Sequence, residues 1–255
     1  MNTVAVNGIN LAYTRRGKGS PLMLVHGFPL DSSSWNEIIP LLESEFDIIT
    51  PDLRGFGRSA TIESPYTISD MADDLAGLLD HLGIGKTAVA GHSMGGYVAL
   101  AFAKKYPNRV SGLGLMSSQA AGDPPDRKEG RYKTAADVAE KGVGVVVEAM
   151  TPKLSADTRI QAFVRSLIEK QSKGGVIGAL KAMAEREDSM SILLTFNFPL
   201  VLIHGDADVL IPIDRSREIK TAVPSAQFVE LRGAGHMPMM EFAKETTEGL
   251  KLLAG

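Results

Sequence analysis

The stretch that decides the fold is GHSMGG, residues 91–96, which lies between two segments of different pattern. Residues 87–90 before it form a short apolar run typical of a buried strand, and residues 97–106 after it have the pattern of a helix. A chain that turns this sharply needs small residues at the corner, and Gly91 and Gly95 provide them on either side of Ser93. The corner exposes the serine hydroxyl and directs the N-terminus of the following helix toward it. This geometry, a nucleophile elbow, is suited to acyl transfer.

Two later segments carry the other groups that such a serine needs. The segment HGDAD, residues 204–208, follows the apolar run 199–203, and GAGH, residues 233–236, follows the alternating run 226–231. Both come directly after the carboxyl end of a predicted strand, where open α/β sheets hold their functional groups. The chain therefore presents a serine, then carboxylates, then a histidine.

With these motifs the sequence resembles the α/β-hydrolase superfamily over nearly all of its 255 residues. HGFP at residues 26–29 and PDLRGFGRS at residues 51–59 extend the resemblance, which is greatest to the small esterase, lactonase and cofactor-free haloperoxidase branch. The resemblance implies an α/β-hydrolase fold: a mostly parallel eight-stranded sheet with helices on both faces and an inserted helical cap. It implies neither a metal nor an organic cofactor.

Ser93 is a poor nucleophile unless a base within hydrogen-bond reach removes its proton. His236 is the one histidine that follows the last predicted strand, in a glycine-flanked loop, and we expect it to be this base. The other four histidines are expected to bond loop backbone, to point away from Ser93 or to be solvated; they are His26, His81, His92 and His204.

The imidazole needs a carboxylate that fixes its tautomer and stabilises the imidazolium. In the resembled pattern a glycine is followed by two variable residues, the acid, three more residues and a proline, which aligns the acid with Asp208 rather than Asp206. Asp206 is then expected to order the loop by bonding backbone N–H groups. Some relatives carry the acid after the sixth strand, but this chain has Ser117, Ser118 and Gln119 there.

The resemblance also assigns an oxyanion hole and suggests a substrate pocket. The backbone N–H groups of Met94 and Phe28 are expected to bind the oxyanion. Trp35, Met116 and Met237 lie near the inferred site in the sequence pattern and are predicted to line an apolar pocket.

Asp52, Arg54 and Arg58 can be interpreted as a site for a substrate carboxylate, but hydrogen bonds to nearby loop backbone are the preferred interpretation.

The first 117 residues alternate strand-like and helix-like patterns, as a parallel sheet with right-handed crossovers requires. Asn7 and Gly8 predict a two-residue hairpin turn with positive φ at both positions. Thr67 and Asp70 have the spacing of a capping box that begins a helix ended by Gly83. Further helices are expected at residues 32–44, 214–222 and 239–253.

The alternation stops between residues 118 and 195, where helical periodicity without strand patterns predicts helices over 138–150, 158–171 and 176–186. A compact domain seldom holds so long an excursion unless it is an inserted unit. We therefore expect a hydrolase core of residues 1–117 and 196–255 and a helical cap of residues 118–195. A binding lid is the functional interpretation of this cap, and a merely decorative insertion is the alternative.

Composition excludes several classes of protein. A net charge of −3 without a basic patch disfavours nucleic acid as a partner, and no run of about 18 apolar residues predicts a membrane span. The absence of cysteine excludes disulfides and thiol chemistry. The polar residues 1–10 do not resemble an export signal, so the cytoplasm is the default location. The sequence does not indicate an oligomeric state.

The sequence thus predicts a serine esterase that cleaves small to medium carboxylic esters or lactones through an acyl-enzyme on Ser93. Perhydrolysis and carbon–carbon bond hydrolysis on the same triad are alternatives, and a ligand receptor with a vestigial triad is the alternative from another class. Haloalkane dehalogenase and epoxide hydrolase chemistry are disfavoured, because those relatives use aspartate where this chain has Ser93.

Overall fold

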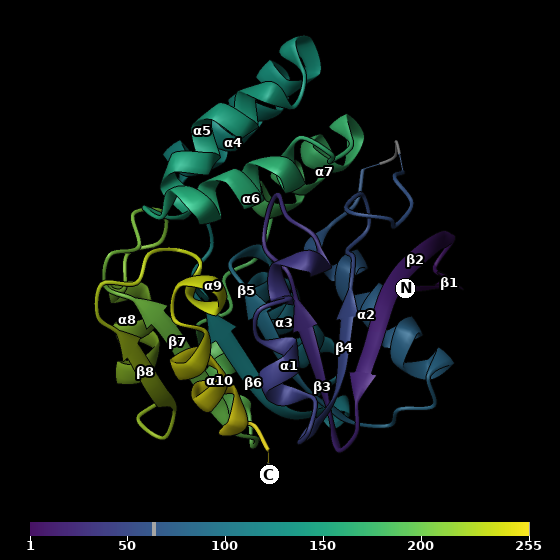
Figure 1. Ribbon diagram of the computed structural model, residues 1–255, viewed down its shortest axis with the longest axis vertical. Coiled ribbons are helices and arrows are strands. Elements are labelled where there is room, and N and C mark those ends of the chain that lie inside the picture. Colours follow the sequence, from purple (N-terminus) through teal and green to yellow (C-terminus); the bar gives the residue numbers. More distant parts are fainter. Residues whose placement is uncertain (63–64, 255) are drawn as a thin grey trace.

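A computed structural model describes residues 1–62 and 65–254. Its centre is an eight-stranded sheet in the order β1-β2-β4-β3-β5-β6-β7-β8 (Figure 1). β1 and β2 pair antiparallel, as do β2 and β4, and all other neighbours are parallel. The strands are β1 (Asn2–Val6), β2 (Ile9–Gly17), β3 (Ser20–Val25), β4 (Phe46–Pro51), β5 (Thr87–His92), β6 (Val110–Met116), β7 (Leu200–Gly205) and β8 (Gln227–Leu231).

Helices cover both faces of this sheet. On one face α1 packs against α10, and on the other α2 packs against α3 (Figure 1). Every residue of the interior strands β5 and β7 is buried, which explains their continuous apolar runs. The core helices are η1 (Ser32–Trp35), α1 (Ile39–Leu42), α2 (Ile68–His81), α3 (Met94–Lys105), η2 (Pro107–Arg109), α8 (Asp214–Ala222), α9 (Pro238–Glu241) and α10 (Ala243–Lys251).

Residues 118–195, all of them described, contain helices and no strand. They form α4 (Pro125–Lys141), α5 (Gly144–Leu154), α6 (Thr158–Ile168), α7 (Lys173–Ala184) and η3 (Ser191–Thr195). α4 packs along α7 and α5 along α6, and the four α-helices lie above the carboxyl ends of the parallel strands (Figure 1).

The segment touches the core through a close backbone contact between two glycines. A Cβ on Gly175, in the first turn of α7, would lie 1.9 Å from the carbonyl oxygen of Gly55 in the loop after β4. Tyr66 Oη donates to the carbonyl of Gly175 at 3.0 Å, and the Gly57 N–H donates to Gln171 Oε1 at 2.9 Å. The backbone of α7 therefore lies directly on a loop of the core.

Two local predictions are confirmed. Asn7 and Gly8 have φ of 45° and 78° and join β1 to β2 as a two-residue turn. Thr67 accepts from the Asp70 N–H while Asp70 accepts from the Thr67 N–H, so the capping box begins α2.

Three predicted helices are interrupted. The helix expected at 32–44 is instead η1, capped by Asp31, followed by the separate α1, because Pro40 lacks the N–H that a continuous helix would use. The prediction of one helix over 138–150 is wrong. α4 begins much earlier, and Gly142, whose φ is 84°, separates it from α5. The last helix is broken at Phe242, where φ is −134° and ψ is 57°.

Candidate active site

Ser93 lies at the corner between β5 and α3 in a conformation that non-glycine residues rarely adopt. Its φ is 52° and its ψ is −115°, and its N–H donates to the carbonyl of Met116 at 2.9 Å. A Cβ on Gly91 would lie 2.0 Å from the carbonyl oxygen of Gly95, and a Cβ on Gly95 would lie 2.1 Å from that of Val25. The tight corner therefore requires both glycines. Strained backbone of this kind is concentrated at functional sites.

Asp208 and His236 are brought together from two loops beyond the ends of β7 and β8. His236 Nδ1 and Asp208 Oδ2 lie 2.7 Å apart, and both side chains are buried. An ionised carboxylate only accepts hydrogen bonds, so Nδ1 carries the proton and Nε2 is left as an acceptor. The pair thus has the tautomer that a general base needs.

The Asp208 carboxylate is strongly held in its ionised form. Oδ1 accepts from the N–H groups of Leu210 at 2.8 Å and Ile211 at 3.0 Å, and His204 Nε2 lies 3.2 Å from Oδ2. Burial opposes ionisation, but the electrostatic interaction with His236 and the hydrogen bonds from His204, His236 and the Ile211 N–H outweigh it. The pKa of Asp208 is therefore well below its ordinary range.

The His236 loop is held against the strand that leads into the elbow. His92 Nε2 lies 2.7 Å from the carbonyl oxygen of His236, and the two imidazole rings are 4.9 Å apart. Burial, together with the nearby His236, lowers the pKa of His92 to about 3, so this ring is neutral and donates to the carbonyl. The residue immediately before Ser93 thus fixes the backbone position of His236.

A cavity of 340 Å³ opens beside Ser93. Phe28, which follows β3, lines it together with Ser93, and Met94 is the first residue of α3. The first N–H groups of a helix have no partner within that helix. The cavity is also lined by residues of α3, α4, α5, α7 and the loop after β7, which are Tyr97, Arg127, Gly130, Arg131, Thr134, Val146, Ala149, Met150, Lys153, Leu180, Met183, Leu210 and Ile211.

The predicted pocket residues Trp35, Met116 and Met237 are not among the residues that the structure places around this cavity. They are at most 1% exposed. Trp35 packs against the ring of His92 at a centroid distance of 6.5 Å, and Met116 lies at the end of β6 below the elbow. Their closeness to the site in sequence does not bring their side chains to its surface. The sequence missed the lining residues of α4, α5 and α7, whose inward faces depend on how those helices pack.

The remaining polar residues of the motifs have structural partners. Asp206 accepts from the Gly233 N–H at 2.6 Å, as expected of a loop-ordering residue. His26 bonds the backbone of Gly27 and Leu53, as predicted. His204 Nδ1 lies 2.7 Å from Ser216 Oγ, and Nε2 lies 2.9 Å from the Ile211 carbonyl. His204 therefore also contacts the acid, which its position in the sequence did not reveal.

Asp52 and Arg54, in the loop after β4, both make buried polar contacts. Asp52 accepts from the N–H groups of Ser32 and Arg58, in agreement with the preferred interpretation. Arg54 instead makes a buried bidentate ion pair with Asp74 of α2, with both N–O distances 2.6 Å.

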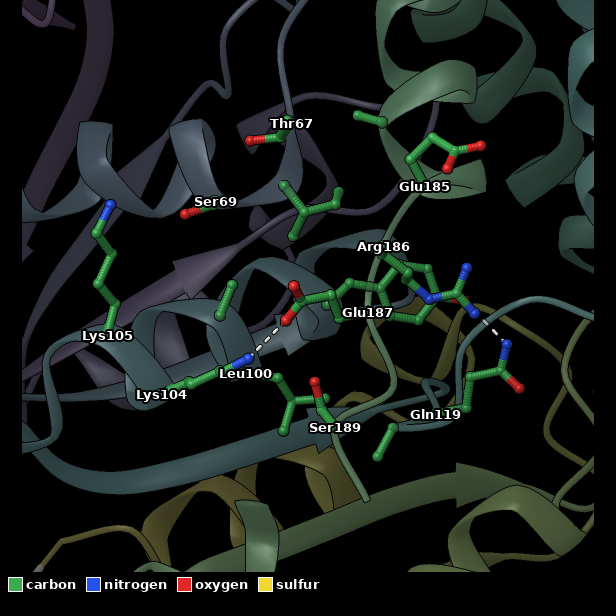
Figure 2. Close-up of a pocket in the computed structure, with 15 residues that line it drawn as sticks. Thr67, Ser69, Leu100, Lys104, Lys105, Gln119, Glu185, Arg186, Glu187 and Ser189 are labelled. Carbon is green, nitrogen blue, oxygen red and sulfur yellow. Dashed lines mark hydrogen bonds and ion pairs between the residues drawn. The ribbon is translucent and has the colours of Figure 1, made fainter. Parts of the chain in front are cut away.

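A second cavity, of 420 Å³, lies away from Ser93 between α2, α3 and the end of α7. Tyr97 lines both cavities, and the Arg186 guanidinium stacks on its ring at 4.1 Å. Figure 2 shows Lys104 reaching Glu187 across this second cavity, a contact of 2.6 Å. Ser93, Asp208 and His236 take no part in its lining.

In the part of the chain that the structure describes, no group of three or more His, Cys, Asp or Glu residues is arranged to hold a metal ion. None of the helices in this part has the length and apolar character needed to cross a membrane.

Comparison with known proteins identifies the family. A family model described as alpha/beta hydrolase fold matches residues 20–243. The chain belongs to this family. Among solved structures, this alpha/beta hydrolase is similar to a thermophilic esterase from Thermogutta terrifontis with malate bound. The two share 40% identity with a TM-score of 0.92, over 98% of this chain and 94% of the other.

Two other relatives have activities that differ from that of the Thermogutta terrifontis esterase. An enol-lactonase from Burkholderia xenovorans LB400 is 25% identical to this alpha/beta hydrolase, with a TM-score of 0.92 over the whole of both chains. The dihydrolipoyllysine-residue acetyltransferase component of an acetoin cleaving system from Pseudomonas putida is 32% identical over 240 residues. The match covers 90% of this chain but only 62% of that longer relative.

Proposed function

We propose that this alpha/beta hydrolase is a serine esterase that cleaves small to medium carboxylic esters or lactones through Ser93, His236 and Asp208. One observation carries the proposal: the Asp208–His236 pair is held, through His92, beside the elbow that presents Ser93 to a cavity. The esterase that shares 40% of its sequence supports the same class of substrate.

In the proposed reaction Ser93 Oγ attacks the ester carbonyl while His236 Nε2 takes the hydroxyl proton. Asp208 stabilises the imidazolium through Nδ1–H. The backbone N–H groups of Phe28 and Met94 stabilise the oxyanion of the tetrahedral intermediate, and each such donor contributes about 3–4 kcal/mol to transition-state stabilisation.

His236 then gives its proton to the leaving alcohol, and the acyl group stays on Ser93. Water, deprotonated by the same imidazole, releases the acid and restores the hydroxyl. The proton taken from Ser93 leaves with the alcohol, and the proton taken from water returns to Ser93.

Residues 118–195 are proposed to form the cap of this site. The cavity is lined on one side by the core residues Phe28 and Ser93 and on the other by residues of α4, α5 and α7. The side chains of these helices would therefore set which acyl and alcohol groups fit.

Turnover of p-nitrophenyl esters of graded acyl length, with Ser93→Ala as the control, tests the proposal. Rapid multiple turnover that Ser93→Ala abolishes is the expected result. A single slow burst without recycling would instead support a receptor with a vestigial triad. Formation of a peracid in the presence of hydrogen peroxide tests the perhydrolase alternative. Cleavage of a β-diketone tests the carbon–carbon hydrolase alternative.

A further inference from the structure

The cavity beside Ser93 has an unbalanced set of charges. Arg127 and Arg131 of α4 and Lys153 of α5 line it. Among the described residues that line this cavity, none is acidic. The rest of the lining is mainly apolar, from residues such as Met150 and Leu180. A pocket of this kind binds apolar groups and orients them by a few charged contacts.

One buried acid, Asp123, partly compensates the arginines. Its carboxylate contacts Arg131, pairs with Arg186 at 2.8 Å and lies 3.7 Å from Arg127 Nε. Burial raises the pKa of Asp123, but Arg131 and Arg186 outweigh burial and hold this pKa below its ordinary value. One negative charge therefore faces three guanidinium groups, and Lys153 adds a fourth positive charge.

Arg127 is the guanidinium with the most capacity left for a ligand. Its contact with Asp123 is long, Nη2 donates to the carbonyl of Leu210 at 3.3 Å, and its side chain is 36% exposed. A guanidinium has five N–H donors, and its planar fork matches a carboxylate. Arg131 differs, because its side chain is only 14% exposed and its Nε–H is directed to Asp123.

We propose that the natural substrate of this site is an ester or lactone that carries a separate carboxylate, bound by Arg127 and Lys153 while Ser93 attacks the ester carbonyl. This inference rests on the proposed esterase function and specifies its substrate class. The carboxylate takes no part in bond making, so its contribution is to binding and orientation.

Two pairs of esters of nearly equal shape test the proposal. For the acyl side, 4-nitrophenyl hydrogen adipate is compared with 4-nitrophenyl 6-methylheptanoate, in which an isopropyl group replaces the carboxylate. For the alcohol side, 3-acetoxybenzoate is compared with 3-acetoxybenzamide. In at least one pair kcat/KM is expected to be about tenfold higher or more for the anion, the gain typical of one hydrogen bond between charged groups. High salt should reduce this preference, because exposed charges are screened.

Arg127→Gln is expected to lower the ratio of kcat/KM for the anionic ester to kcat/KM for its neutral counterpart by about tenfold. Lys153→Gln provides a second, independent variant. Lys133→Gln is the matched control, because it removes one positive charge from an exposed position of α4 outside the cavity lining. The control should leave the ratio unchanged.

The two hypotheses fail in different ways. If the neutral esters are hydrolysed but neither anion is preferred, or if the Lys133 variant changes the ratio as much as the other two, the carboxylate site is overturned and the esterase function stands. If neither ester of a pair is hydrolysed, the esterase function fails. Calorimetric titration of adipate into Ser93→Ala and into Ser93→Ala/Arg127→Gln then tests the site without turnover; equal binding, or no binding to either, overturns it.

Discussion

The substitution Asp208→Asn tests the assignment of the acid, because the structure dictates how the new amide must lie. Asp208 Oδ1 accepts from the backbone N–H groups of Leu210 and Ile211, and these donors would hold the asparagine oxygen in the same place. The NH₂ group would then take the place of Oδ2, 2.7 Å from His236 Nδ1.

An NH₂ group in that place donates to His236 Nδ1 and forces the ring proton onto Nε2. The imidazole then cannot take the proton of Ser93. The opposite amide orientation sets NH₂ against two N–H donors, each left unsatisfied at a cost of about 1–3 kcal/mol. We therefore expect kcat to fall by about 10⁴-fold, the effect of the wrong tautomer in serine hydrolase triads, with KM little changed.

The assay is steady-state hydrolysis of p-nitrophenyl butyrate, with thermal unfolding measured alongside to show that the variant is folded. Asp206→Asn is the matched control, because an asparagine oxygen can still accept from the Gly233 N–H as Asp206 Oδ1 does. This control should retain nearly full kcat. The reasoning is refuted if Asp208→Asn keeps more than about a tenth of the wild-type kcat, or if Asp206→Asn loses as much.

Three further predictions concern the surroundings of the site. Arg54→Met should lower the free energy of unfolding by about 3–5 kcal/mol, because it leaves the fully buried Asp74 charge unpaired, and adding Asp74→Leu should restore most of this loss. His92→Gln should weaken the pH dependence of stability. The pKa of His92 is about 3 in the folded state and about 6.5 in the unfolded state, so between these values the unfolded chain binds one more proton. The free energy of unfolding therefore falls as the pH is lowered. From pH 7 to pH 5 this residue accounts for a loss of about 2 kcal/mol, measurable by urea unfolding. Gly95→Ala should lower kcat by about 100-fold, because a methyl group 2.1 Å from the Val25 carbonyl displaces the elbow.

Each of these predictions has a control or a contradicting result. For the ion pair, a double variant no more stable than Arg54→Met would contradict the explanation. For the pH effect, a His92→Gln variant that loses as much stability between pH 7 and pH 5 as the wild type would contradict the explanation. For the elbow, Gly85→Ala adds a methyl group into open space and should leave kcat unchanged.

The parts of the site that the sequence could predict are those encoded in short local patterns. The corner at Ser93 follows from its flanking glycines, and the loops of Asp208 and His236 follow directly after recognisable strands. The chain order of parallel strands then brings these loops to one edge of the sheet. The 2.7 Å contact of Asp208 and His236 agrees with the pairing expected from the sequence.

The cavity lining could not be predicted in this way, because it depends on how α4, α5 and α7 pack over the core. Met237 follows His236 in the chain, but its side chain is fully buried below the surface, whereas Arg127 is far from the elbow in sequence and lines the cavity with Ser93. Helix breaks were also hard to place: nothing in the sequence around Phe242 marks the break between α9 and α10.

The contact of Gly55 with Gly175 has a consequence for how substrate range can change. Two peptide groups in direct contact cannot be compressed, so they fix the height of α7 over the sheet. Because α7 supplies Leu180 and Met183 to the cavity, the same contact fixes the height of the cavity above Ser93. Selection for the hydrolysis of bulkier esters should therefore replace the α7 side chains that line the cavity by shorter ones and leave Gly55 and Gly175 unchanged.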